Sequence, residues 1–278
     1  MSAERDTIIE IKNLIKIYRK GHIEVTALRG INLEVKKGDM LAILGSSGSG
    51  KTTLLNVIGG ISISSAGTTK VNQQEISTLS ESQLAKYRRE SIGFVWQIAN
   101  LLPDLNIIDN VRLTMFAAGK FKRGEVNDRA KKLLDDVSII HRAKHRIFQI
   151  SGGELQRASI AIALANDPQI LLADEPTGEL DSETSQNIVD MLRMLNEKYG
   201  KTMLIVTHNP TVAKQCKRQL TIKDGVILKQ PLKSGIEHID IDNEGYLKIP
   251  EELMSMFANK RVRVIQTRDN EIKLTTEV

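Results

Sequence analysis

Residues 45–52 have the sequence GSSGSGKT, which places three glycines, a lysine and a threonine in one short segment. Glycines allow the backbone to close around an anion so that successive N–H groups point at it. Lys51 could bridge the β- and γ-phosphates of a nucleotide, and Thr52 could bind Mg²⁺ through its hydroxyl. We therefore predict a phosphate-binding loop made of Gly45, Ser46, Ser47, Gly48, Ser49, Gly50, Lys51, Thr52 and Thr53.

A second chemical pattern is the pair of carboxylates that follows the apolar run 170–173. Asp174, at the tip of a predicted strand, could hold Mg²⁺. Glu175 would point in another direction, where it could polarise water for in-line attack on a γ-phosphate. An acidic pair after a strand is more often a solvated turn, but the phosphate loop in the same chain favours the chemical interpretation.

A third pattern, Ser-Gly-Gly-Glu, occupies residues 151–154. Serine followed three residues later by glutamate is a capping box, which begins a helix without any ligand. The paired glycines weaken a first turn unless a ligand approaches the backbone, and a helix N-terminus attracts anions. Because a single nucleotide already has its loop at 45–52, this second phosphate-facing turn is expected to serve the nucleotide of another subunit.

The hydrophobic pattern predicts the elements that must position these motifs. Alternating apolar and polar residues over 7–18 are typical of a half-buried strand, and the apolar run 40–44 of a central one. Further strands are expected at 32–35, 68–71, 92–96, 170–173 and 202–207, and helices at 51–58, 125–137, 154–165 and 182–199. Together they predict an α/β core interrupted by a mostly helical insert at about 106–165.

Composition limits the compartment and the partners. The lone cysteine, Cys216, excludes an intramolecular disulfide and fits a reducing compartment. The N-terminus lacks a signal-peptide core, and no apolar run approaches the ~18 residues that span a bilayer, so a membrane role requires a partner. The net charge is +5, and basic residues concentrate at 120–132 and 142–146, as solvated helix faces or as a surface for anionic lipid. Nucleic acid is not expected, because aromatic residues are only 4% and no recognition motif is present.

The charge balance changes near QPLKSGI at 230–236, where we predict a linker between domains 1–230 and 236–278. The second domain has strand patterns YLKI, VRVIQT and EIKLTT around a short helix at 251–258. Its GYLKIPEEL segment at 245–253 resembles the swapped-hairpin β-fold of AbrB-like proteins, which implies a dimerisation or regulatory appendage. From Leu232 onward there are 7 Lys/Arg and 9 Asp/Glu, which argues against DNA binding. The alternative is that the second domain has a purely structural role.

The ordered motifs across residues 8–229 resemble those of ATP-binding cassette (ABC) ATPases, the nucleotide-binding subunits of ABC transporters. The resemblance implies a P-loop NTPase (RecA-like) α/β core with an antiparallel β subdomain and a helical subdomain, to which the small β-rich C-terminal domain is added. It identifies 45–52 as the Walker A loop and 170–175 as the Walker B strand with its catalytic glutamate. The implied ligands are ATP and Mg²⁺.

The resemblance also implies roles for single residues. Glu175, His208 and Gln97 would be catalytic, and Thr52, Gln97 and Asp174 would hold the metal. Beyond the phosphate loop, the nucleotide contacts would be Tyr18 on adenine and, across a dimer, Ser151, Gly152, Gly153 and Asp181. Asp181 could equally be a helix N-cap and Tyr18 a sheet-edge aromatic.

Within the superfamily, SIGFVWQIANLLPDLNIIDNV and ADEPTGELD resemble the branch of lipoprotein-release, macrolide-export and cell-division ATPases. ISGGELQ, Ile162 and Glu179 depart from the usual pattern of that branch. The resemblance implies a homodimer that hydrolyses ATP to drive an integral membrane permease, peripheral on the cytoplasmic face of the cell membrane. The alternative is a non-transport ABC ATPase that regulates a membrane or cell-wall complex. A soluble translation or repair factor is disfavoured, because the chain has neither two cassettes nor long coiled coils.

Overall fold

The structure is a computed structural model that describes residues 6–21, 23–228, 262–266 and 272–276. The chain divides into two compact units, Met1–Gln230 and Pro231–Val278. Within the described residues, no helix is both long enough and apolar enough to cross a bilayer. The first unit contains two sheets and a group of helices, and these carry every predicted chemical motif.

The N-terminal sheet has four strands in the order β2-β1-β4-β5. Strands β1 (Thr7–Lys20) and β2 (Ile23–Lys36) form a long antiparallel pair, and β4 (Ala66–Val71) and β5 (Gln74–Glu75) extend it. The expected strand at 32–35 was too short, because β2 begins at Ile23. Its first residues are exposed and lack the alternation of a buried strand, so only the pairing with β1 identifies them.

The second sheet has six strands in the order β10-β9-β3-β8-β7-β6. Its strands are β3 (Met40–Leu44), β6 (Ile92–Val95), β7 (Ile170–Asp174), β8 (Thr202–Thr207), β9 (Arg218–Lys223) and β10 (Val226–Leu228). Every pairing among β9, β3, β8, β7 and β6 is parallel, and only β10 is antiparallel. Strands β7 and β8 are fully buried, as expected for a parallel sheet covered on both faces. Their carboxyl ends therefore meet at one edge.

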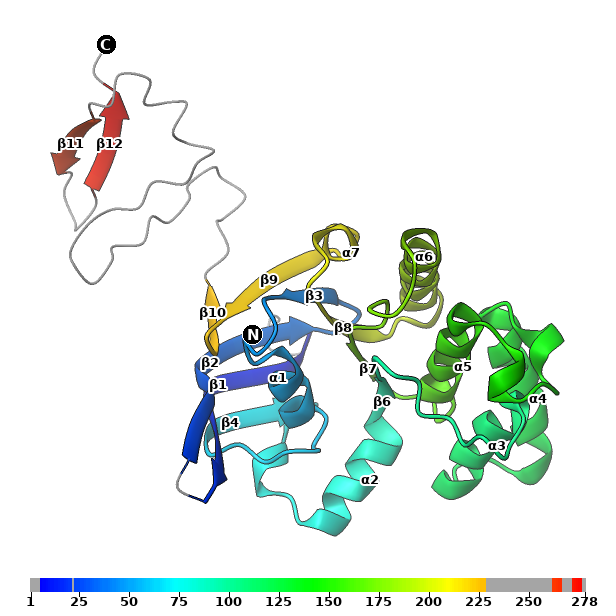
Figure 1. Ribbon diagram of the computed structural model, residues 1–278. Coiled ribbons are helices and arrows are strands. Elements are labelled where there is room, and N and C mark those ends of the chain that lie inside the picture. Colours follow the sequence, from blue (N-terminus) through cyan, green and yellow to red (C-terminus); the bar gives the residue numbers. More distant parts are fainter. Residues whose placement is uncertain (1–5, 22, 229–261, 267–271, 277–278) are drawn as a thin grey trace. The chain divides into compact units, whose positions relative to one another are not determined.

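Helices pack on this framework. Helix α1 (Lys51–Ile58) is separated from β3 only by the glycine-rich loop. Helix α2 (Glu81–Ser91), which was not predicted, leads into β6. Helices α3 (Ile107–Ala118), α4 (Arg123–Asp136) and α5 (Gly152–Leu164) form the expected helical insert, which lies beside β6 and β7 (Figure 1). Helix α6 (Ser182–Tyr199) joins β7 to β8, and the short α7 (Pro210–Lys214) follows β8.

The second unit contains a described hairpin of β11 (Val262–Gln266) and β12 (Ile272–Thr276), paired antiparallel. These strands coincide with the predicted VRVIQT and EIKLTT segments. The predicted YLKI strand and the helix at 251–258 lie outside the described residues. The AbrB-like fold therefore stays a prediction.

We predict that Gly93→Ala destabilises the first unit by about 1–3 kcal/mol. Gly93 lies in β6, and an added Cβ would be 2.3 Å from the Ala163 carbonyl oxygen and 2.9 Å from the Leu171 side chain. Thermal unfolding should show a fall of several degrees. Gly124→Ala is the matched control, because its Cβ would meet nothing within 4 Å and alanine favours the helix. A Gly93→Ala protein with the same unfolding temperature as the wild type would contradict this packing.

Candidate functional site

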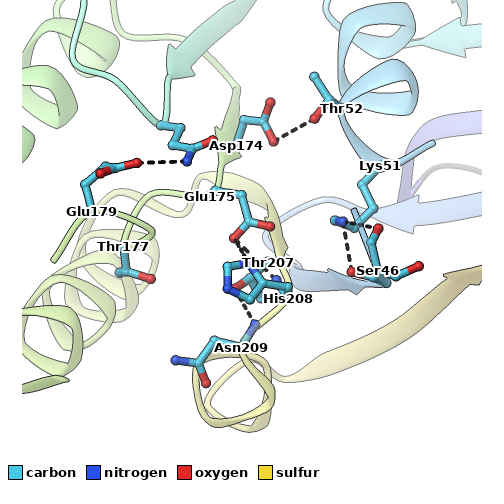
Figure 2. A network of polar contacts seen from close by, with 12 residues as sticks. Ser46, Lys51, Thr52, Asp174, Glu175, Thr177, Glu179, Thr207, His208 and Asn209 are labelled. Carbon is cyan, nitrogen blue, oxygen red and sulfur yellow. Dashed lines mark hydrogen bonds and ion pairs between the residues drawn. The ribbon is translucent and has the colours of Figure 1, made fainter. Parts of the chain in front are cut away.

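Four neighbouring strands bring the predicted chemical residues to one edge of the sheet. The loop 45–52 follows β3, Asp174 and Glu175 end β7, His208 follows β8 and Gln97 follows β6. Because these strands are parallel and adjacent in the order β3-β8-β7-β6, their carboxyl ends are neighbours. Ligands of open parallel sheets bind at this edge. Figure 2 shows Lys51, Thr52, Asp174, Glu175 and His208 gathered there.

The loop 45–52 has the backbone that a phosphate site requires. Gly48 and Gly50 have φ values of 77° and 104°, which side chains other than glycine rarely adopt. Lys51 is buried, and its ammonium donates to the carbonyls of Gly45 at 2.9 Å and Ser46 at 2.8 Å. The charge is therefore held within the loop, beside the N-terminus of α1. The buried Ser49 hydroxyl has no hydrogen-bond partner among the residues that the structure describes, so it could bind a ligand.

Thr52 and Asp174 form a pair of oxygen ligands between α1 and β7. The Thr52 hydroxyl donates to Asp174 Oδ1 at 3.1 Å (Figure 2). Burial raises the pKa of Asp174, and the negative charge of Glu175 adds to this, while the Thr52 hydrogen bond and Lys51 oppose it. Burial disfavours the charged form of Asp174, and a bound cation would stabilise that form. Both oxygens suit Mg²⁺, which prefers one or two protein ligands together with substrate phosphates. Accordingly, the described residues contain no cluster of three or more His, Cys, Asp or Glu that could hold a metal alone.

Glu175 and His208 contact each other at the ends of β7 and β8. Glu175 Oε2 lies 3.0 Å from His208 Nδ1 and accepts from the His208 backbone N–H at 3.3 Å (Figure 2). Glu175 has φ of 46°, a left-handed conformation that costs a non-glycine residue about 1–3 kcal/mol. Its own N–H donates to the Val206 carbonyl at 3.0 Å, which holds the turn against β8. The strained backbone thus aims the carboxylate away from Asp174 and toward His208.

Gln97 pairs with a residue that the sequence did not connect to it. Its Nε2 donates to Glu179 Oε1 at 3.2 Å. Glu179 belongs to the turn after β7, in which the Gly178 N–H donates to the Glu175 carbonyl at 3.0 Å. The loop after β6 is thereby linked to the turn that carries Glu175.

The turn at 151–154 begins α5 with a complete capping box. Ser151 Oγ accepts from the Glu154 N–H at 3.2 Å, and Glu154 Oε2 accepts from the Ser151 N–H at 2.8 Å. Gly153 has an internal reason to be glycine, since a Cβ there would lie 2.6 Å from Thr184 Cγ2 in α6. The sequence had suggested that a ligand approaching the backbone explains the paired glycines. Packing against α6 is a second explanation for Gly153.

Asp181 and Tyr18 lie outside this group. Asp181 is the N-cap of α6, where its carboxylate accepts from the Thr184 N–H at 2.9 Å, as the alternative interpretation expected. Tyr18 lies on β1 with 42% of its surface exposed, and the Lys16 ammonium is 4.9 Å from its ring centroid. Among the described residues, neither the Ser151 turn nor Tyr18 forms a hydrogen bond to the phosphate loop.

Sequence reasoning missed Arg142 and Glu179. Arg142 was grouped with a solvated basic segment, yet its Nε donates to Glu154 Oε1 at 2.7 Å. Glu179 was noted only as a departure from the family pattern, yet it holds Gln97. The partners are 12 and 82 residues apart, so no short-range spacing rule could have found them.

We predict that Asp174→Asn raises the stability of the nucleotide-free protein by about 0.5–2 kcal/mol at pH 7. Asp174 has a raised pKa in the folded state, so burying its charge costs stability above that pKa, and asparagine keeps an oxygen for Thr52. The advantage should disappear as pH falls through the raised pKa toward the ordinary value of 3.8. Thermal unfolding against pH measures this. The exposed Asp128→Asn is the control, and an Asp174→Asn protein that is less stable at pH 7 would contradict the burial argument.

Comparison with known proteins agrees with this geometry. Residues 28–178 match the family model described as ABC transporter. The chain is 40% identical over 227 residues to the lipoprotein-releasing system ATP-binding protein LolD of Shewanella frigidimarina (strain NCIMB 400), which covers 82% of this chain and 95% of that relative.

Solved structures of ATP-binding cassettes also resemble the chain. The chain resembles the ATP-binding cassette MJ0796, solved as a dimer in a post-hydrolysis state with ADP and Pi (TM-score 0.75, 38% identity, 82% of this chain and 100% of that chain). It also resembles cbiO1 of Clostridium perfringens, part of the ABC transporter complex cbiONQ (TM-score 0.73, 29% identity, 81% and 88%). With the phosphate loop and the carboxylates at the strand ends, these matches show that the chain belongs to the ABC transporter family, as an ATP-binding and ATP-hydrolysing subunit.

Proposed function

We propose that two copies of the chain bind two ATP molecules between them and that their closure drives a membrane permease. The convergence of Lys51, the Thr52–Asp174 pair and the Glu175–His208 pair at one sheet edge is the observation that carries this proposal. It supplies a phosphate loop, metal ligands and a base, but the Ser151 turn makes no hydrogen bond to it. A second copy would supply that turn to the nucleotide.

The chemistry is hydrolysis of the γ-phosphate by in-line attack of water. Glu175 polarises the attacking water, and His208 orients the Glu175 carboxylate through the 3.0 Å contact. Lys51 exchanges its two loop carbonyls for phosphate oxygens as ATP binds. Thr52, Asp174 and Gln97 would hold Mg²⁺, which supplies charge neutralisation on the phosphates when bound. Catalysis of this kind consists mostly of positioning and electrostatic stabilisation.

Five further residues, on three separate segments, complete the nucleotide site in this proposal. Tyr18, whose ring is partly exposed, would stack on adenine. Ser151 and its two glycines would contact the terminal phosphate bound by the partner. Asp181 would communicate between the two sites through α6, whose N-terminus it caps and against which Gly153 packs.

The permease would dock beside Gln97. Ile98, Leu102 and Phe148 are 77%, 50% and 72% exposed, and the segments that carry them are neighbours, because the Ile107 N–H donates to the His145 carbonyl at 2.9 Å. Exposed apolar residues on adjacent loops are typical of an interaction surface. The likeness to LolD suggests a permease of the lipoprotein-release, macrolide-export or cell-division type, with this chain peripheral to the membrane.

The second candidate is a non-transport ATPase that regulates a membrane or cell-wall complex. The ATP site would be the same, so the partner distinguishes the two. Purification of tagged Glu175→Gln from ATP-loaded native membranes, with mass spectrometry, should recover a permease. Recovery of only cell-wall or division proteins would favour regulation instead.

We predict that Glu175→Gln retains ATP binding, forms a stable dimer with ATP and loses ATP turnover by at least about 100-fold, because a general base contributes about that much. Phosphate release measures turnover, and light scattering measures the dimer. Exposed Glu197→Gln in α6 is the matched control and should hydrolyse ATP at the wild-type rate. Full ATPase activity in purified Glu175→Gln would refute the assignment.

We further propose that residues 236–278 form a separate domain with a dimerisation or regulatory role. The compact unit Met1–Gln230 contains every residue of the proposed ATP site. A protein lacking 236–278 should therefore bind ATP with wild-type affinity, measured by calorimetry. Loss of nucleotide binding on deletion would place the boundary elsewhere.

A further inference from the structure

Glu154 carries a negative charge at a turn that the proposed function assigns to a phosphate. Its carboxylate is the third residue beyond the N-cap Ser151, and Oε2 accepts from both the N–H and the hydroxyl of Ser151, at 2.8 and 3.1 Å. A carboxylate so close to the turn repels an incoming polyphosphate, and the repulsion grows as closure excludes water. The turn therefore needs a compensating positive charge.

Arg142 supplies that charge from a different element. Its Nε donates to Glu154 Oε1 at 2.7 Å, so the arginine binds one carboxylate oxygen and the Ser151 turn binds the other. The arginine ends the short turn Ile140–Arg142, and its N–H donates to the Ile139 carbonyl at 2.9 Å. His145 Nε2 lies 3.4 Å from its guanidinium, and His141 Nε2 lies 3.6 Å from Glu154.

The pairing keeps Glu154 ionised. The Ser151 backbone N–H and the Arg142 guanidinium lower the pKa of Glu154 to about 2, so the carboxylate does not escape the repulsion by binding a proton near neutral pH. Charge must therefore be balanced by the arginine rather than by protonation. A capping box accepts either glutamate or glutamine at this position, so the turn could form without the charge.

We propose that Arg142 is a positioning residue for the ATP-sandwich dimer: it neutralises Glu154 and holds its carboxylate, so that the Ser151 turn of one copy can receive the terminal phosphate held by the other. The inference rests on the proposed function. Arg142 touches neither substrate nor metal, and acts through Glu154.

The test is ATP-driven dimerisation of the full chain, in a Glu175→Gln background that prevents turnover. Arg142→Ala should weaken the dimer by about tenfold, measured by analytical ultracentrifugation, because it leaves an unbalanced carboxylate at the interface. Adding Glu154→Gln should restore dimerisation, because the amide keeps the capping box and removes the charge. Arg142→Lys should retain most of the affinity, since it keeps the charge. Lys144→Ala is the control, because it removes an equal charge from an exposed neighbour.

The outcomes separate the inference from the proposed function. If Glu175→Gln itself does not dimerise with ATP, the sandwich proposal fails, and the inference fails with it. If it dimerises and Arg142→Ala dimerises equally well, only the inference is overturned. A weakened Arg142→Ala dimer that Glu154→Gln does not restore would mean that Arg142 merely supports the fold. In the expected result, the Arg142→Ala monomer has the same melting temperature and the same ATP affinity as the Glu175→Gln parent.

Discussion

The parallel pairing of β3, β8, β7 and β6 is the constraint on which the site depends. Paired residues such as Leu44 and Thr207, and Asp174 and Val206, fix where each strand ends relative to its neighbour. A slip in register would separate Thr52 from Asp174, and Glu175 from His208. Strands β7 and β8 are fully buried and mostly apolar, so the hydrophobic effect that stabilises the fold also aligns the polar residues at their ends.

The edge itself is locally unfavourable, as functional sites commonly are. Asp174 is buried with a raised pKa, Glu175 has a left-handed backbone, and the buried Ser49 hydroxyl has no partner within the described part of the chain. A bound cation would offset the cost of the buried Asp174 charge, and a bound phosphate that of the Ser49 hydroxyl. These offsets would contribute to the affinity for the nucleotide, and binding would stabilise the fold accordingly.

Positive charge is used structurally in much of the helical insert. Arg129 donates to the carbonyls of Leu164 and Ala165, and Lys120 donates to that of Asn166, so both satisfy groups at the C-terminal end of α5. Arg142 binds Glu154 near the N-terminus of the same helix. Helix α5 is thus held at each end by cations from other elements. Each of these three residues thus has a hydrogen-bond partner within the fold, which its charge alone did not indicate.

The motifs that predict the chemistry, and most of the framework, could be read from local sequence. The loop 45–52 and Asp174–Glu175 were identifiable because their residues are contiguous. Strands β3 and β8 and helices α1 and α6 have the predicted bounds because their apolar patterns are strong. Tertiary structure decided the rest: the length of β2, the Gln97–Glu179 link and the Arg142–Glu154 pair. These depend on contacts between residues far apart in the chain, and such contacts exist only after the sheet has fixed the distances between its loops.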